Sequence, residues 1–154
     1  VLIFDMFKGW MAVKYTAFFE IFNDKPELLI NTSILLGISA IIGHIFPLFA
    51  GFKGGKGVAT TFGVLLALHP LATLSGAAVF FIVLFITKYV SASSIIAGIS
   101  FPLWTMFLFD SQYQILNIFT VLISLLIIVT HFKNLKRLIK GEENKAEFLF
   151  KSKN

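Results

Sequence analysis

The chain has 154 residues, 57% of them hydrophobic, and a mean hydropathy of +0.88. A soluble domain of this length does not carry so many apolar residues, so the composition predicts an all-α, polytopic transmembrane helix bundle. The formal net charge is +5 and there is no cysteine, which excludes disulfides, thiolate nucleophiles and thiolate metal sites.

Six apolar segments are the expected membrane spans, and the third is unusually short. They cover residues 1–22, 28–49, 58–68, 71–87, 95–109 and 114–130. A span needs roughly 20 residues to cross about 30 Å of hydrocarbon. A helix over 58–68 would be only about 17 Å long, so its start is sunk below one surface if its end reaches the other. Asp5 and Lys8 interrupt the first span but share a helix face and are expected to pair. Pro102 predicts a kink in the fifth span.

Basic residues predict the orientation of the bundle. We expect residues 131–140 to continue as a basic helix, and residues 133–154 to be the cytoplasmic basic tail of a single domain, 1–154. The outer turns at 23–27, 69–70 and 110–113 then contain one basic residue, Lys25. Positive charge concentrates on the cytoplasmic side of membrane proteins, as this arrangement requires. The loops at 51–57 and 88–94 fall on the same side as the tail, so the polar motifs converge there.

The glycine-rich stretch between the second and third segments is the strongest candidate for a binding site. A glycine-rich turn that enters a helix directs backbone N–H groups and the positive end of the helix dipole at one place, which suits phosphate. It is not a Walker A loop, since Gly57 stands where Ser or Thr is required. The alternative is a loop whose lysines only set the topology. The residues predicted to hold phosphate are Lys53, Gly54, Gly55, Lys56 and Gly57.

Two further groups of polar residues lie on the same predicted side. Ser91 and Ser94 could donate to a phosphate or glycerol oxygen, or could simply cap a helix. His131, Asn134 and Arg137 are spaced three apart and lie on one helix face, where they could bind an anion or an acyl carbonyl. The alternative for this stripe is a basic helix end that meets anionic headgroups.

His44 ends the second span, where the choice lies between a phosphate ligand and a structural, hydrogen-bonded histidine. No Ser-His-Asp spacing, H-E-x-x-H motif or carboxylate cluster is present, so proteolysis and metal-dependent hydrolysis have no support. We expect neither a metal nor a cofactor.

The motifs together resemble one family. Gly43-His-x-Phe-Pro followed by Phe52-Lys-Gly-Gly-Lys-Gly-Val-Ala-Thr60 is similar to the central motif of the bacterial membrane glycerol-3-phosphate acyltransferases of the acyl-phosphate-dependent, PlsY type. Asp5-x-x-Lys8-Gly9, Tyr89-Val-Ser-x-x-Ser94 and His131-x-x-Asn134-x-x-Arg137-Leu138-x-x-Gly141-x-Glu143 resemble its other elements, in the right order. The resemblance covers essentially the whole chain, and its central motif is specific.

The resemblance implies a seven-helix enzyme of the bacterial inner membrane with its active site and C-terminus in the cytoplasm. It would transfer a fatty acyl group from acyl-phosphate to the 1-hydroxyl of glycerol-3-phosphate, giving lysophosphatidic acid for phospholipid biosynthesis. Lys56 and the glycine backbone would hold phosphate. His131 and Asn134 would lie at the glycerol phosphate or at the reacting centre, with Ser91 or Ser94 nearby. The family's first span and first inner loop, which carries an anion-binding arginine, have no counterpart here. We therefore expect six spans in this chain and the activity in a longer parent.

Two other functions remain as alternatives. A carrier or channel for phosphate or small anions would bind its substrate at the same glycine-rich stretch but would make no covalent bond. A non-catalytic subunit would dock on anionic lipid through the basic tail. The expected partners are acyl-phosphate, glycerol-3-phosphate and the lipid bilayer, with no nucleic acid; a monomeric state stays open.

Overall fold

A computed structural model describes residues 1–52 and 54–146, and every regular element in that part of the chain is a helix. The α-helices are α1 (Leu2–Lys14), α2 (Pro26–Ile45), α3 (Val58–Leu68), α4 (Pro70–Thr87), α5 (Val90–Leu103), α6 (Gln114–Thr130) and α7 (Phe132–Lys140). Short 3₁₀ turns cover Tyr15–Phe18, Glu20–Phe22 and Leu48–Ala50, and a π-helical turn covers Trp104–Leu108.

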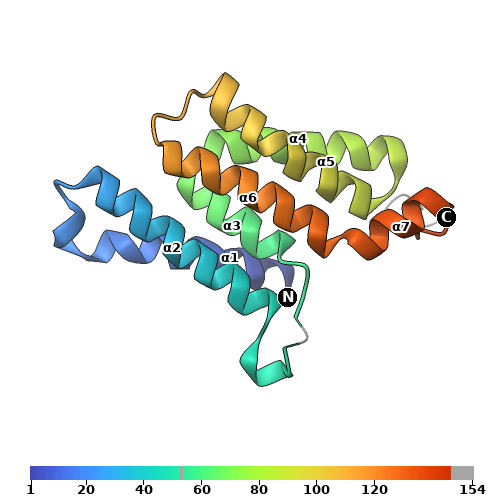
Figure 1. Ribbon diagram of the computed structural model, residues 1–154, viewed down its shortest axis with the longest axis horizontal. Helices are drawn as coiled ribbons and strands as arrows, with labels where there is room; N and C mark the ends of the chain where they lie inside the picture. The colour runs from blue at the N-terminus through green and yellow to red at the C-terminus, as the bar shows by residue number, and fades with distance from the viewer. Residues whose placement is uncertain (53, 147–154) are drawn as a thin grey trace, which may run out of the picture.

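The helices form a bundle in which α3 and α6 are sandwiched between two pairs. Helices α4 and α5 lie on one side and α1 and α2 on the other (Figure 1). The end of α2, the start of α3, the α4–α5 junction and the end of α6 all lie at the same end of the bundle as α7. We refer to it as the α7 end.

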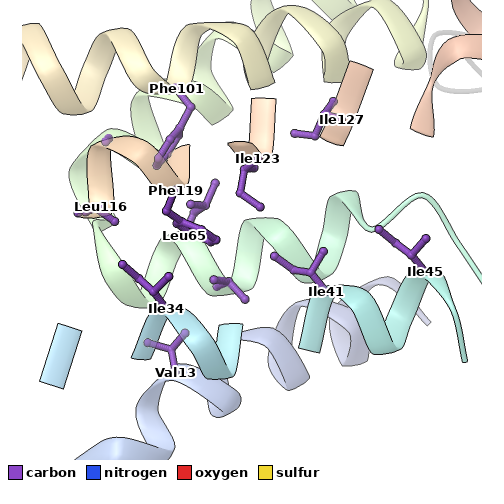
Figure 2. Packing of buried hydrophobic residues seen from close by; sticks show 12 residues of the cluster. Val13, Ile34, Ile41, Ile45, Leu65, Phe101, Leu116, Phe119, Ile123 and Ile127 are labelled. Atoms are coloured by element: carbon purple, nitrogen blue, oxygen red, sulfur yellow. The ribbon is translucent and has the colours of Figure 1, made fainter. Parts of the chain in front are cut away.

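The core lies between these layers. Ile34 and Ile41 of α2, Leu65 of α3, and Phe119 and Ile123 of α6 point toward one another there (Figure 2). Helix α3 is the most enclosed α-helix, since it is the one in the described chain with no exposed residue. The short helix predicted over residues 58–68 is therefore confirmed, and it lies inside the bundle.

Glycines bring α1 and α3 into backbone contact. A side chain on Gly9 would collide with the carbonyl oxygen of Thr60, and one on Gly63 would collide with that of Met6. Small residues at such positions allow helices to pack closely in membranes, where the lipid provides no hydrophobic drive for helix association. This contact fixes the depth of α3 beside α1.

Fewer helices than predicted are long enough to cross a bilayer alone. Among the described residues, α2, α4 and Val90–Leu108 each meet the length and hydropathy of a span, and the bent pair α6–α7 can form a fourth. Helix α3, with 11 residues, and α1, with 13 residues, are shorter. The expectation of six spans therefore stays a prediction.

Three element boundaries differ from the predictions. The first helix does not continue to residue 22, because 3₁₀ turns replace it after Lys14 and the Thr16 hydroxyl donates to the Val13 carbonyl oxygen instead. Helix α5 begins at Val90 rather than at residue 95, so the serines lie in its first turns and not in a loop. After Pro102, which lacks an N–H, the helix continues as a π-helical turn.

Candidate active site

The glycine segment, residues 54–57, packs against the C-terminal end of α2 and leads into α3. Gly57 is the N-cap of α3, with φ +80°, a left-handed conformation that disfavours other residues. The Gly54 N–H donates to the Ile45 carbonyl oxygen at 3.2 Å, and a side chain on Gly54 would collide with that oxygen and with the His44 carbonyl. The segment is glycine-rich because its backbone passes directly against α2.

Of the two lysines predicted here, the structure describes Lys56, and Lys53 lies outside the described residues. Partial burial lowers the pKa of Lys56, the negative charge of Glu143 acts in the opposite direction, and the positive charge of Arg137 lowers it further. Such charges act only over short distances in salt solution. The segment 54–57 that leads into α3, which we call the mouth of α3, therefore lies close enough to the C-terminal helix for their charges to interact.

His131 lies at the bend between α6 and α7, whose axes differ by 58°, and is 2% exposed. Its Nδ1 is 2.9 Å from the Ile127 carbonyl oxygen. Since a carbonyl only accepts hydrogen bonds, Nδ1 carries the proton and Nε2 keeps a lone pair. Burial lowers the pKa of His131, the bond to Ile127 opposes this, and the charge of Lys56 lowers the pKa further. The ring is therefore neutral at pH 7.

Glu143 is the common acceptor of the site and was not among the predicted site residues. Its Oε1 accepts from Ser91 Oγ at 2.6 Å and from Asn134 Nδ2 at 2.7 Å, and its Oε2 accepts from Arg137 Nε at 2.8 Å. The side chain is 8% exposed. Burial would raise the pKa of Glu143, but the hydrogen bonds from Ser91 and Asn134 and the charge of Arg137 outweigh it and lower the pKa. The carboxylate therefore stays ionised and ties α5 to α7.

The chain reaches this position because it reverses after α7. Gly141 has φ +72°, and the Glu142 N–H donates back to the Arg137 carbonyl oxygen at 2.8 Å, which ends the helix in a left-handed cap. The Ala146 N–H then donates to the Lys88 carbonyl oxygen at 2.8 Å. The segment after the predicted basic helix thus contacts the α4–α5 junction, a contact that the sequence did not indicate.

The two predicted serines have different surroundings. Ser91 donates to Glu143, as described above. Ser94 is also buried, but its hydroxyl donates to the Val90 carbonyl oxygen of its own helix at 2.9 Å. The structure therefore brings Ser91, rather than Ser94, into direct contact with the other site residues.

His44 belongs to a second cluster, next to the glycine segment. Lys8 Nζ lies 2.6 Å from Asp5 Oδ1, as the sequence predicted, and 2.7 Å from His44 Nδ1. His44 Nδ1 also lies 3.3 Å from Asp5 Oδ1, but the ammonium is the nearer group and can only donate, so we assign Nδ1 as the acceptor and place the proton on Nε2. That Nε2 lies against Gly55, where a side chain would collide with it. The cluster therefore orients an imidazole N–H toward the glycine segment.

The site offers a positively charged, donor-rich surface at the α7 end. It combines the cations Lys56 and Arg137, the neutral base His131 and the amide of Asn134, with one fixed carboxylate. Within the described residues, no three His, Asp or Glu side chains are grouped closely enough to hold a metal ion. A hollow of about 480 Å³ lies elsewhere, lined by residues such as Phe19, Asn23 and Tyr113 of the opposite end. We assign the site by its charges and contacts rather than by this hollow, which holds none of these groups.

Comparison with known proteins gives a consistent result. The family model described as "Glycerol-3-phosphate acyltransferase" matches residues 1–141. A glycerol-3-phosphate acyltransferase of Fusobacterium nucleatum is 42% identical over 148 residues, which cover 96% of this chain and 72% of that protein. The Staphylococcus carnosus protein of the same name is 38% identical over 151 residues, covering 97% of this chain and 73% of that protein.

Two solved structures have the same fold. Both are crystal structures of PlsY, an integral membrane glycerol 3-phosphate acyltransferase. The glycerol 3-phosphate form matches with a TM-score of 0.82 and 31% identity, over 97% of this chain and 72% of that one. The lysophosphatidic acid form matches with a TM-score of 0.81 and 32% identity, over 97% of this chain and 74% of that one.

Proposed function

The chain belongs to the PlsY-type glycerol-3-phosphate acyltransferase family, and from that premise we propose that it transfers a fatty acyl group from acyl-phosphate to the 1-hydroxyl of glycerol-3-phosphate. The products are lysophosphatidic acid and phosphate. One observation carries the proposal: Glu143 joins Ser91, Asn134 and Arg137 by hydrogen bonds at the end of the bundle where α3 begins, and its charge and that of Arg137 act on Lys56. Both proposed substrates carry a phosphate group, which a positively charged site of this kind can bind.

In the proposed complex, the backbone N–H groups of residues 55–57 and the Lys56 ammonium bind a substrate phosphate, whereas the N–H of Gly54, also predicted to bind it, is already bound to the Ile45 carbonyl oxygen. The N–H at His44 Nε2, held toward the loop by Lys8, adds a donor. Arg137 keeps half of its side chain exposed while Nε is bound to Glu143, so its guanidinium can receive a second phosphate. Positioning of two phosphorylated substrates is the main task, because acyl-phosphate is already an activated anhydride.

The reaction forms an ester bond between the 1-oxygen of glycerol-3-phosphate and the acyl carbonyl carbon, and it breaks the bond from that carbon to the phosphate oxygen. The hydroxyl proton passes to the lone pair on His131 Nε2, and the departing phosphate keeps the bonding electrons. Lys56 and Arg137 stabilise the negative charge that develops. Glu143 is a positioning residue rather than the base, since both of its oxygens already accept hydrogen bonds.

The membrane context fits the substrates. The apolar helices leave large hydrophobic side chains on the outside, including Phe85 of α4 at 66% and Phe107 at 80% exposed, and these face lipid in an integral membrane protein. We propose that the α7 end faces the cytoplasm of the inner membrane, in keeping with its lysines. The acyl tail of the donor then lies in the bilayer while its phosphate reaches the site.

The test is an acyl-transfer assay on the chain reconstituted in vesicles, with acyl-phosphate and glycerol-3-phosphate as substrates and lysophosphatidic acid as the measured product. Lys56→Gln is expected to lower kcat/KM by about 100-fold or more, because it removes a charge that acts on the transition state. Lys25→Gln, at the opposite end, is the matched control and should retain the rate. Phosphate flux into the vesicles without acyl transfer would refute the proposal and favour an anion carrier.

A further inference from the structure

Helix α7 differs from every other helix of the described chain in its distribution of charge. Its nine residues include Lys133, Lys136, Arg137 and Lys140 and no acidic residue. The axis of α7 is turned by 58° from that of α6. If α6 stands across the bilayer, α7 lies closer to the membrane plane than to its normal. Figure 1 shows α7 beyond the end of α6, at the edge of the bundle.

The helix has three distinct faces. Asn134 is 5% exposed and faces the site with its hydrogen bond to Glu143. Phe132 and Ile139, two turns apart and so on one side, are 53% and 79% exposed. Lys133, Lys136 and Lys140 follow one another at helical spacing and are all exposed. Lys136 Nζ lies 4.7 Å from the centre of the Phe132 ring, so the basic stripe adjoins the apolar one.

We propose that α7 lies in the membrane interface and binds anionic phospholipid headgroups through Lys133, Lys136 and Lys140, with Phe132 and Ile139 inserted among the acyl chains. An apolar face beside a lysine-rich face is the pattern of helices that lie on an anionic membrane surface. The partner is the lipid leaflet at the α7 end, because its negative headgroups complement the lysines. The inference does not depend on acyl transfer.

This placement gives the lipid surface a direct connection to the site. The same helix carries Asn134 and Arg137, which donate to Glu143, so the lipid-facing side and the site-facing side are one rigid element. Lysines 133, 136 and 140 have no part in those hydrogen bonds. Their replacement therefore tests lipid binding separately from the proposed chemistry.

The absence of cysteine permits a clean experiment. Ile139→Cys is labelled with the environment-sensitive fluorophore NBD, and the chain is reconstituted in vesicles of phosphatidylcholine and phosphatidylglycerol in equal parts. Either lipid is supplied in brominated form as the quencher. We expect brominated phosphatidylglycerol to quench more strongly than brominated phosphatidylcholine. A label at exposed Asn144, on the polar segment after α7, is the control and should show weak quenching by both.

A variant with fewer lysines tests whether the charge of α7 causes the preference for phosphatidylglycerol. Lys133→Gln with Lys140→Gln should lower the selectivity for phosphatidylglycerol by up to about fivefold per lysine. Lys14→Gln with Lys25→Gln removes the same charge from the opposite end and should leave the selectivity unchanged. Equal quenching by both lipids in the unaltered chain would overturn headgroup binding. No quenching by either lipid would overturn the interfacial placement and point to a protein partner on this face instead.

Discussion

The Glu143 carboxylate accepts hydrogen bonds from three donors, so its removal is the strongest test of how the site is held together. Glu143→Ala leaves Asn134 Nδ2 and Ser91 Oγ without an acceptor, at about 1–3 kcal/mol each. The lost ion pair with half-exposed Arg137 adds at most about 1 kcal/mol. The free energy of unfolding should therefore fall by roughly 2–7 kcal/mol, toward the lower half of that range because water reaches the edge of the site.

Two matched variants separate charge from shape. Glu143→Gln keeps an acceptor oxygen for Ser91 and Asn134 but loses the charge opposite Arg137, so we expect a smaller loss, of about 1–2 kcal/mol. Glu142→Ala, at an exposed neighbour, should stay within about 0.5 kcal/mol of the unaltered chain. Titration of SDS into detergent micelles measures each free energy. A Glu143→Ala chain as stable as Glu142→Ala would refute the role of Glu143.

The same contribution has a predicted pH dependence. The pKa of Glu143 in the folded chain lies below its ordinary value of 4.5. Its stabilising effect is therefore fully present above that value and is lost as the pH falls through the lower, folded-state pKa. The stability difference between the unaltered chain and Glu143→Gln should accordingly shrink below about pH 4.5, whereas a difference that persists in acid would contradict an ionised carboxylate.

Three further predictions concern separate parts of the chain. Because the pKa of Lys56 is lowered, its charge is lost on the alkaline side below its ordinary value of 10.5, so KM for glycerol-3-phosphate should rise there. Lys56→Arg, which stays charged, should abolish that rise, and an unchanged profile would count against Lys56 as the ligand. Gly63→Ala should cost about 1–3 kcal/mol of unfolding free energy, because its methyl group meets the Met6 backbone. Gly43→Ala, with nothing within 4 Å, is the control and should be neutral or stabilising. His131→Gln should lower kcat by about 100-fold or more; an unaffected kcat would mean that the hydroxyl proton leaves by another route.

Local patterns in the sequence predicted most of the bundle. The apolar runs are long enough to be recognised individually, and His69-Pro70 marks the end of α3 because proline is favoured at the first turn of the next helix. The Asp5–Lys8 pair follows from helix spacing alone. The start of α5 was predicted five residues late because Ser91, Ser93 and Ser94 read as a polar link. In the structure they are buried, and Ser93 and Ser94 satisfy their hydroxyls on the preceding turn.

The connections between distant segments could not be derived from these patterns. Glu143 was visible in the motif after Gly141, but its contact with Ser91 joins residues 52 positions apart and depends on how α7 bends. For His44 the sequence left a phosphate ligand and a structural histidine as alternatives, and it gave no sign of the contact between its Nδ1 and Lys8, 36 positions away. Spacing gives the face of a helix on which a residue lies, whereas the partner across the bundle depends on the packing of all the helices.

The proposed function requires the mouth of α3 and helix α7 to act together as one site for the two substrate phosphates. Calorimetric titration of glycerol-3-phosphate into the unaltered chain, Lys56→Gln, Arg137→Gln and the double variant tests it directly. Two groups of one coupled site should be non-additive, with an interaction energy of about 0.5–3 kcal/mol in the binding free energy. Losses that add within about 0.3 kcal/mol would place the two cations at independent sites and contradict the account.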